Sequence, residues 1–214
     1  MPLALLGLGV LCAQTVPLSP STVKAVQVKV EAASFKGRRA LRVTDDSAQG
    51  AGDEARYAVV ANSAFQDGAI EVDLAGDVMP GAGGGARGFV GVAFRVNAEA
   101  PRFECFYLRP TNGRADDQER RNHSAQYISI PGFPWQKLRK ETPERYESYV
   151  DLVPGEWTQV KIVVKGQDAR LFVHGNAQPT LIVKDLKQTV APGAIGLWVG
   201  PGTVAHFANL RLAK

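Results

Sequence analysis

The chain has 214 residues, of which 45% are hydrophobic and 21% are charged, and its formal net charge is +4 at pH 7. This composition is typical of a globular protein and excludes a disordered chain. The charge is mild and most basic residues are dispersed, which argues against a nucleic-acid-binding surface. The length fits a single large β-domain, and no linker or internal repeat divides the sequence.

The N-terminal residues have the pattern of an export leader. The apolar run over residues 3–13 is too short to span a bilayer, which needs about 20 residues, and it fits the apolar part of a secretory signal peptide. The basic residues that usually precede such a run are missing. We predict a signal peptide over residues 1–14, a folded domain over residues 22–214, and a secreted or periplasmic protein without a membrane span.

Two cysteines are present. Cys12 lies in the predicted leader and leaves open a lipoprotein anchor, although Leu11 stands where a small residue is expected. With the leader removed, Cys105 is alone and an internal disulfide is excluded. Cys105 lies in an alternating segment, so we predict a buried or half-buried thiol.

Most apolar segments after the leader alternate with a period of two, which indicates β-strands. In chain order the predicted strands are 26–32, 40–44, 57–61, 68–74, 88–96, 103–109, 127–130, 157–165, 169–174, 194–200 and 204–212. The residues Gly166-Gln167-Asp168 predict a hairpin turn between two of them.

No segment has the apolar stripe of an amphipathic helix. The best candidate, residues 116–124, is nearly all polar and predicts a loop or one short turn. Many strands without helices must bury their apolar faces sheet against sheet. We therefore predict an all-β fold, a two-sheet antiparallel β-sandwich of jelly-roll type.

Four motifs follow one another over residues 65–212: FQDGAIEVDL, GFVGVAFRV, PGEWTQVKIVVKGQDARLFVHGNAQP and GAIGLWVGPGTVAHFANLRL. In this order they resemble the concanavalin A-like lectin/glucanase sandwiches, in particular laminin G-like domains and the 3-keto-disaccharide hydrolase domain family. The resemblance implies a concanavalin A-like jelly roll. The chain departs from the hydrolase family at FECFYLRP, where a YEVQI-like strand is expected, and in the polar insertion that follows. No catalytic residue is therefore transferred.

The stretch from Phe103 to Tyr149 concentrates Arg, Asp, His, Tyr and Trp residues, as loops that present a surface to a ligand often do. If Phe106 and Leu108 face the core, their neighbours in the strand point away from it. The same parity rule, with Ile128 and Ile130 facing inward, predicts one outward patch formed by Arg95, Tyr107, Arg109 and Tyr127.

The insertion from Asn112 to Glu147 is expected to carry two further residues, His123 and Trp135, over this patch. Aromatic faces stack on sugar C–H surfaces, and arginine forks bind hydroxyl and carboxylate groups. The predicted ligand-binding residues are Arg95, Tyr107, Arg109, His123, Tyr127 and Trp135. A solvated sheet face with cross-strand pairs would produce the same pattern.

Catalytic residues cannot be assigned from the sequence. Glycoside hydrolysis normally needs two carboxylates about 5–10 Å apart, and Glu104 is the only acid in the central strand. Asp116, Asp117 and Glu119 could supply acids from the loop. Asn112, Asp116 and Asp117 also leave open a Ca²⁺ site, without the spacing of a known calcium loop; otherwise no cofactor is predicted.

We predict an exported, lectin-like sandwich that binds carbohydrate on its concave sheet. Two alternatives stay open. One is a glycoside-active hydrolase of the 3-keto-disaccharide type, against which the missing acid pair argues. The other is a laminin G-like protein-binding module, whose contact surface would be more apolar than the predicted patch. The ligand is expected to be a glycan, and the oligomeric state is left open.

Overall fold

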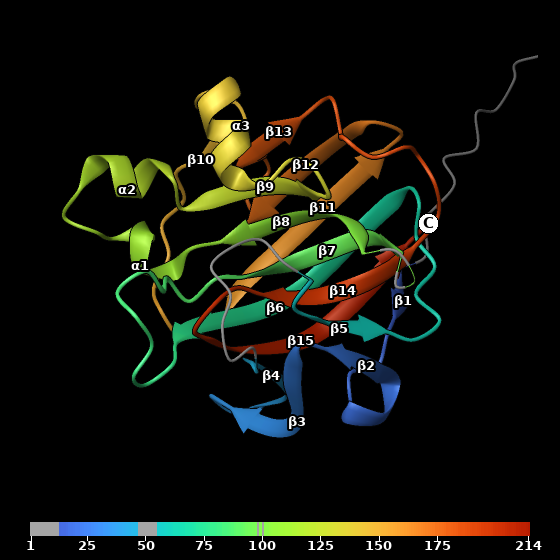
Figure 1. Ribbon diagram of the computed structural model, residues 1–214. Coiled ribbons are helices and arrows are strands. Elements are labelled where there is room, and N and C mark those ends of the chain that lie inside the picture. Colours follow the sequence, from blue (N-terminus) through green and yellow to red (C-terminus); the bar gives the residue numbers. More distant parts are fainter. Residues whose placement is uncertain (1–12, 47–54, 98, 100) are drawn as a thin grey trace, which may run out of the picture.

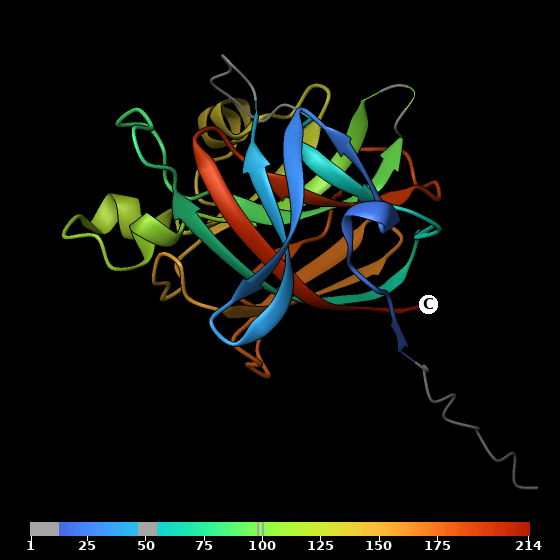
Figure 2. The same cartoon turned by 90° about the horizontal axis from the view of Figure 1, so that it is seen from below.

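The computed structural model describes residues 13–46, 55–97, 99 and 101–214. These residues form a sandwich of two antiparallel β-sheets (Figures 1 and 2). The predicted leader, with Cys12, lies outside the described residues except for its last two positions. Within the described residues, no helix is both long enough and apolar enough to cross a membrane.

The first sheet has eight strands in the order β13-β12-β11-β6-β15-β4-β3, and β1 pairs with the C-terminal part of β15. Their bounds are β1 Gln14–Thr15, β3 Val28–Phe35, β4 Arg38–Asp45, β6 Gly68–Val78, β11 Thr158–Lys165, β12 Asp168–Val173, β13 Leu181–Val183 and β15 Thr203–Ala213.

The second sheet has seven strands in the order β10-β9-β8-β7-β14-β5-β2. Their bounds are β2 Val23–Val26, β5 Tyr57–Val60, β7 Val90–Asn97, β8 Arg102–Leu108, β9 Ala125–Ile130, β10 Glu147–Ser148 and β14 Ala194–Val199. The predicted all-β, two-sheet sandwich is thus confirmed, and the predicted strands coincide with strands of the structure. The short strands β1, β2, β10 and β13, which have two to four residues each, were not predicted.

Helices are few and short: the 3-10 turn η1 (Pro20–Thr22), α1 (Pro110–Gly113), α2 (Gln118–Asn122) and α3 (Trp135–Glu141). The single turn of α2 agrees with the prediction for the polar stretch. The helix α3, which begins at Trp135, was not predicted from the sequence. Only Leu138 of α3 is buried, so the helix has no apolar stripe that a sequence pattern could reveal.

The inner face of the seven-stranded sheet is identified by its contact with β6. A Cβ added to Gly76 of β6 would come within 2.6 Å of Val90 Cγ1, so Val90 points toward the other sheet. By alternation Val92 and Phe94 point the same way, and Phe106 lies directly opposite Val92. The predicted inward direction of Phe106, and with it the outward direction of Tyr107, is confirmed.

The predicted parity of β9 was wrong. Tyr127 lies opposite Phe106 and Ser129 lies opposite Glu104, so both point into the sandwich while Ile128 points outward. Every residue of β9 except Ile130 is buried. Because both faces of the strand are packed, the apolar residues do not mark which face is the inner one.

Arg95 also departs from the predicted patch. The pairing of β7 with β8 shifts between Phe94 and Asn97, and Arg95 adopts a φ of 52°, so alternation is interrupted there. Its guanidinium donates to Gln66 O at 3.0 Å, Gly166 O at 2.7 Å and Asp67 Oδ1 at 3.1 Å. Arg95 therefore fastens neighbouring turns together, away from the predicted patch.

A buried carboxylate joins the central strands to the segment after β13. The Tyr127 hydroxyl donates to Glu104 Oε2 at 2.5 Å, and the Gln188 amide donates to Glu104 Oε1 at 2.8 Å. The Lys187 amide in turn donates to the Tyr127 hydroxyl at 3.0 Å. Burial raises the pKa of Glu104, while the hydrogen bonds from Tyr127 and Gln188 oppose that effect.

Gly91 allows large aromatic rings to pack closely on the outward face of the seven-stranded sheet. It lies directly opposite Tyr107 on β8 and Trp198 on β14, whose ring centroids are 4.8 Å apart. A Cβ on Gly91 would be 2.3 Å from Phe106 O and 2.5 Å from Tyr107 Cβ. Both rings are 1% exposed, so the absence of a side chain lets them pack beside each other.

We expect Gly91→Ala to lower the free energy of unfolding by about 1–3 kcal/mol, because backbone atoms as well as Tyr107 would have to shift. Gly83→Ala is the matched control, since a Cβ there meets no atom within 4 Å and should change stability by less than about 0.5 kcal/mol. Urea denaturation of the three proteins measures both effects. Equal stabilities of the two variants would contradict this packing.

Glu104 should make stability depend on pH. Its folded pKa lies above the ordinary value of 4.5, so the folded state holds the proton more tightly than the unfolded state. The stabilisation is complete below pH 4.5 and is lost as pH rises through the folded pKa. Each tenfold difference in proton affinity between the two states corresponds to about 1.4 kcal/mol of stability.

Glu104→Gln removes this titration. From pH 4 to pH 8 the wild type should therefore lose stability relative to the variant, whatever constant cost the amide introduces. Chemical denaturation at several pH values measures the difference. Glu141→Gln, at an exposed position of α3, controls for the loss of a carboxylate, and parallel pH profiles for wild type and Glu104→Gln would refute the expectation.

Candidate functional site

A pocket of about 350 Å³ lies where the insertion between β8 and β9 meets α3 and the loop before β7. In Figures 1 and 2, α1 and α2 project from one end of the sandwich, beyond the ends of the strands. The residues that line the pocket are Gly85, Arg87, Phe89, Arg109, Asn112, Asp117, Glu119, Arg120, His123, Trp135 and Arg139. Its size is at the lower end of the range found for small-molecule sites.

Arg109 connects, through its side chain, the segments that form this pocket. It follows the last residue of β8, and its side chain donates to His123 O at 2.8 Å, Tyr107 Oη at 2.8 Å and Gln126 Oε1 at 3.2 Å. Its guanidinium carbon lies 4.9 Å from the ring centroid of Tyr107 and 5.7 Å from that of Trp135. One side chain thus links β8, β9, the end of α2 and the start of α3.

Trp135 forms an aromatic wall between two arginines. Its ring lies 5.7 Å from the guanidinium carbon of Arg109 and 4.6 Å from that of Arg139. Arg139 is fixed by Glu147, to which Nε donates at 3.0 Å and Nη2 at 2.7 Å. A two-pronged contact with a buried carboxylate sets the orientation of the guanidinium plane, so Trp135 and Arg139 are held in a defined geometry.

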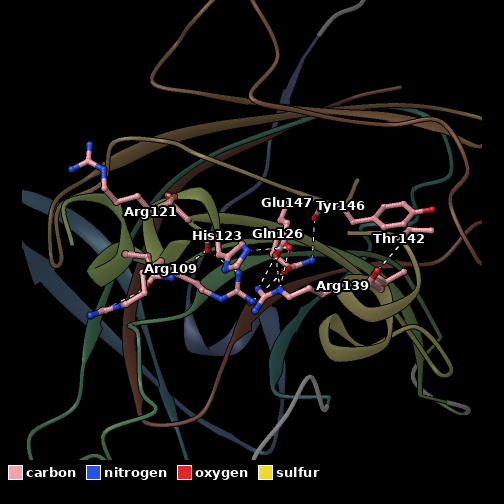
Figure 3. A network of polar contacts seen from close by, with 12 residues as sticks. Arg109, Arg121, His123, Gln126, Arg139, Thr142, Tyr146 and Glu147 are labelled. Atoms are coloured by element: carbon pink, nitrogen blue, oxygen red, sulfur yellow. Dashed lines mark hydrogen bonds and ion pairs between the residues drawn. The ribbon is translucent and has the colours of Figure 1, made fainter. Parts of the chain in front are cut away.

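His123 lies beside Arg109, Arg139 and Glu147, as Figure 3 shows. Its Nε2 lies 3.3 Å from Glu147 Oε1. Burial lowers the pKa of His123, and the charges of Arg139 and Arg109 lower it further, while Glu147 opposes them. A neutral His123 donates through Nε2 to the carboxylate, which leaves Nδ1 as a hydrogen-bond acceptor.

The two short helices supply polar groups at the rim. Asn112 of α1 is buried, and its side-chain amide lies 3.4 Å from both His123 O and Arg120 Nη2. Asp117 caps α2 by accepting from the Arg120 amide at 3.0 Å. Asp117 and Glu119 are both exposed, so these acids face the solvent side of the pocket.

Three of the six residues predicted to bind a ligand line this pocket: Arg109, His123 and Trp135. Tyr107 lies on the outward face as expected, but it is only 1% exposed. Its hydroxyl accepts a hydrogen bond from Arg109, and its ring packs against the guanidinium. Arg95 and Tyr127 lie elsewhere, Arg95 at the irregularity in β7 and Tyr127 inside the sandwich. The predicted patch on one sheet face is therefore replaced by a pocket at the end of the strands.

Four lining residues were not singled out from the sequence: Arg87, Phe89, Arg120 and Arg139. Three of them are arginines from separate segments, and most basic residues are dispersed in the sequence. Nothing in the sequence brings residues 87, 120 and 139 together.

The described residues contain no group of three or more His, Cys, Asp or Glu side chains that could hold a metal ion. Of the three residues considered for Ca²⁺, Asn112 is occupied with His123 and Arg120, and Asp117 caps α2. Cys105 is buried, as predicted, and does not reach the pocket.

No protein-family model matches the sequence, and no curated protein matches it. Solved structures do match in fold. The carbohydrate-binding module CBM66 from Bacillus subtilis is similar with a TM-score of 0.59 and 13% identity, over 90% of this chain and 96% of that chain. A Bacillus subtilis protein of unknown function with a galectin-like fold has a TM-score of 0.54 and 12% identity, over 88% and 87% of the two chains.

A third structure, described as a native glycosidic hydrolase, has a TM-score of 0.54 and 12% identity and covers 96% of each chain. At these identities the likeness shows the fold alone. It supports a concanavalin A-like or galectin-like sandwich over nearly the whole chain. The finer resemblance to laminin G-like and 3-keto-disaccharide hydrolase domains stays a prediction.

Proposed function

We propose that this chain is a carbohydrate-binding domain and that its ligand occupies the pocket between the ends of β8 and β9, the α1–α2 insertion and α3. The observation that carries the proposal is the half-buried ring of Trp135, held between Arg109 and Arg139 on a pocket lined by polar groups. An aromatic face with convergent hydrogen-bonding groups is the combination that a sugar ring needs.

The polar lining is varied enough to bind hydroxyl groups. A neutral His123 offers an acceptor, Arg87 and Arg120 offer donors, and Glu119 offers a carboxylate at the rim. The groups that hold the pocket are themselves fixed by hydrogen bonds to buried partners, so little ordering is required when a ligand binds. The fold supports the same conclusion, because similar folds occur in a protein described as a carbohydrate-binding module and in one described as a glycosidic hydrolase.

The proposed location differs from the open concave sheet expected from the sequence. The side chains at the centre of the outward face, including Tyr57, Tyr107 and Trp198, are each 1% exposed. Buried rings cannot stack on a ligand. The pocket keeps polar and aromatic groups accessible, which supports a site at the end of the sheet.

A hydrolase is the second candidate, because Asp117, Glu119 and His123 all line the same pocket. A glycosidase needs one carboxyl group that stays protonated near neutral pH, and burial in an apolar environment is the usual cause. Asp117 and Glu119 are exposed, and the buried Glu104 lies inside the sandwich. Binding without cleavage is therefore favoured, and release of reducing ends from bound oligosaccharides would establish the alternative.

We expect Trp135→Ala to weaken the binding of an oligosaccharide identified on a glycan array by at least about fivefold, or about 1 kcal/mol. The loss follows from removal of the stacking surface. Calorimetric titration measures the dissociation constants of wild type and variant.

Trp157→Ala is the matched control. This half-buried tryptophan precedes β11 of the eight-stranded sheet and packs edge-on against Phe35, so its loss should leave affinity unchanged. Thermal unfolding of both variants shows whether they are folded. Equal affinities of wild type and Trp135→Ala would remove the pocket as the binding site.

A further inference from the structure

The pocket gathers more positive charge than its own acids neutralise. Four arginines line it, from the loop before β7, the end of β8, α2 and α3. Arg139 has a carboxylate partner in Glu147, with Nη2 and Oε2 2.7 Å apart. Among the described residues, no carboxylate lies within ion-pair distance of Arg87, Arg109 or Arg120.

Arg109 is the most constrained of the three. It is only 5% exposed, yet the three acceptors of its side chain are a backbone carbonyl, a tyrosine hydroxyl and a glutamine amide, all of them neutral. These hydrogen bonds satisfy N–H groups, and aromatic rings lie 4.9 to 6.0 Å from the guanidinium carbon, but none of these partners carries a negative charge. A buried charge without a counter-charge is costly in free energy, and an anion in the pocket would relieve that cost.

Arg87 and Arg120 still have N–H groups to offer. Arg87 donates through Nη1 to Gly84 O at 2.6 Å and to Ala86 O at 2.8 Å. Arg120 reaches Thr111 O and Asn112 Oδ1 through Nη2 only at 3.5 and 3.4 Å. Its buried Nε makes no hydrogen bond with the part of the chain that the structure describes.

The arginines also act on one another. Partial burial lowers the pKa of Arg87, and the charges of Arg120 and Arg109 lower it further. The positive charges of these three arginines therefore repel one another. The two acids that line the pocket do not end this repulsion, because Asp117 is engaged with the α2 backbone and Glu119 is exposed at the rim.

Resting on the proposed function, we infer that the carbohydrate is acidic and carries a carboxylate or sulfate group that Arg87 and Arg120 bind in the field of Arg109. Planar guanidinium groups match the paired oxygens of such anions, and charge-assisted hydrogen bonds are about twice as strong as neutral ones. The sugar ring packs on Trp135, so the aromatic wall selects a carbohydrate while the arginines select its charge.

The first experiment is a glycan array on which each acidic oligosaccharide stands beside its neutral counterpart, carboxyl-reduced or desulfated. The expected result is binding to acidic members at least about tenfold above their neutral counterparts. Comparison of carboxylated with sulfated members then identifies the anion. Equal binding within pairs would overturn the inference and leave the proposed function standing, whereas binding to no glycan would overturn both.

The second experiment places the anion. The acidic oligosaccharide with the strongest signal and its neutral counterpart are titrated against Arg87→Gln, Arg120→Gln and the wild type. Each variant should weaken the acidic ligand about tenfold more than it weakens the neutral ligand, because only the acidic ligand loses a charge-assisted contact. Arg87→Lys keeps the positive charge but loses the planar pair of N–H donors, so it should retain part of the affinity for the acidic ligand.

Arg170→Gln is the matched control, because it removes an exposed arginine from β12 of the other sheet, where it pairs with Asp168. Its affinities should equal those of the wild type, which separates a local contact from a change in net charge. Equal losses for all three Arg→Gln variants, or no loss in Arg87→Gln and Arg120→Gln, would overturn the inference. Thermal unfolding confirms that each variant is folded.

Discussion

The contacts of Arg109 determine how the candidate site is built. The residue follows β8, where the chain leaves the sheet, and its side chain reaches β9, the end of α2 and the ring that begins α3. Because α2 buries none of its residues and α3 buries only Leu138, apolar packing does little to fix these helices to the sheet. A guanidinium with several donors in one plane can hold three acceptors at defined angles, and it stabilises the pocket without closing it.

The same feature gives the pocket its electrostatic character. The Arg109 guanidinium supplies several hydrogen-bond donors but also a positive charge, and its three hydrogen-bond acceptors are neutral. Arg87 and Arg120 add to that charge, while Arg139 is paired with the buried carboxylate of Glu147. Hydrogen bonds or aromatic rings support each of the four arginines. Charge that is supported but not neutralised favours anions, and this preference distinguishes the pocket from one built to bind neutral sugars.

Packing on both faces of the seven-stranded sheet explains why the site lies at its end. Tyr107 and Trp198 close over Gly91 on the outward face, and Glu104 and Tyr127 are enclosed on the inward face. A sheet packed on both sides offers no open surface along its strands. The segments that extend beyond the strands are less constrained by the core and can carry charged and aromatic groups, which is why the candidate site is proposed there.

The sequence by itself determined the class of fold, since strand-like alternation over most of the chain and the lack of an amphipathic helix leave a two-sheet sandwich as the way to bury the apolar faces. It also drew attention to Arg109, His123 and Trp135, which line the candidate pocket, because they stand in or beside a polar, aromatic insertion that a β-domain does not need for its core. The direction of Phe106 and Tyr107 followed from alternation as well.

Only the tertiary structure decided the rest. The orientation of β9 depended on which face met the other sheet, and its residues are buried on both sides, so the apolar pattern carried no information about Tyr127. The direction of Arg95 depended on an irregular pairing that alternation does not encode. The convergence of Arg87, Arg109, Arg120 and Arg139 arose from four separate segments, because proximity in a sandwich is set by strand order and loop packing and not by distance along the chain.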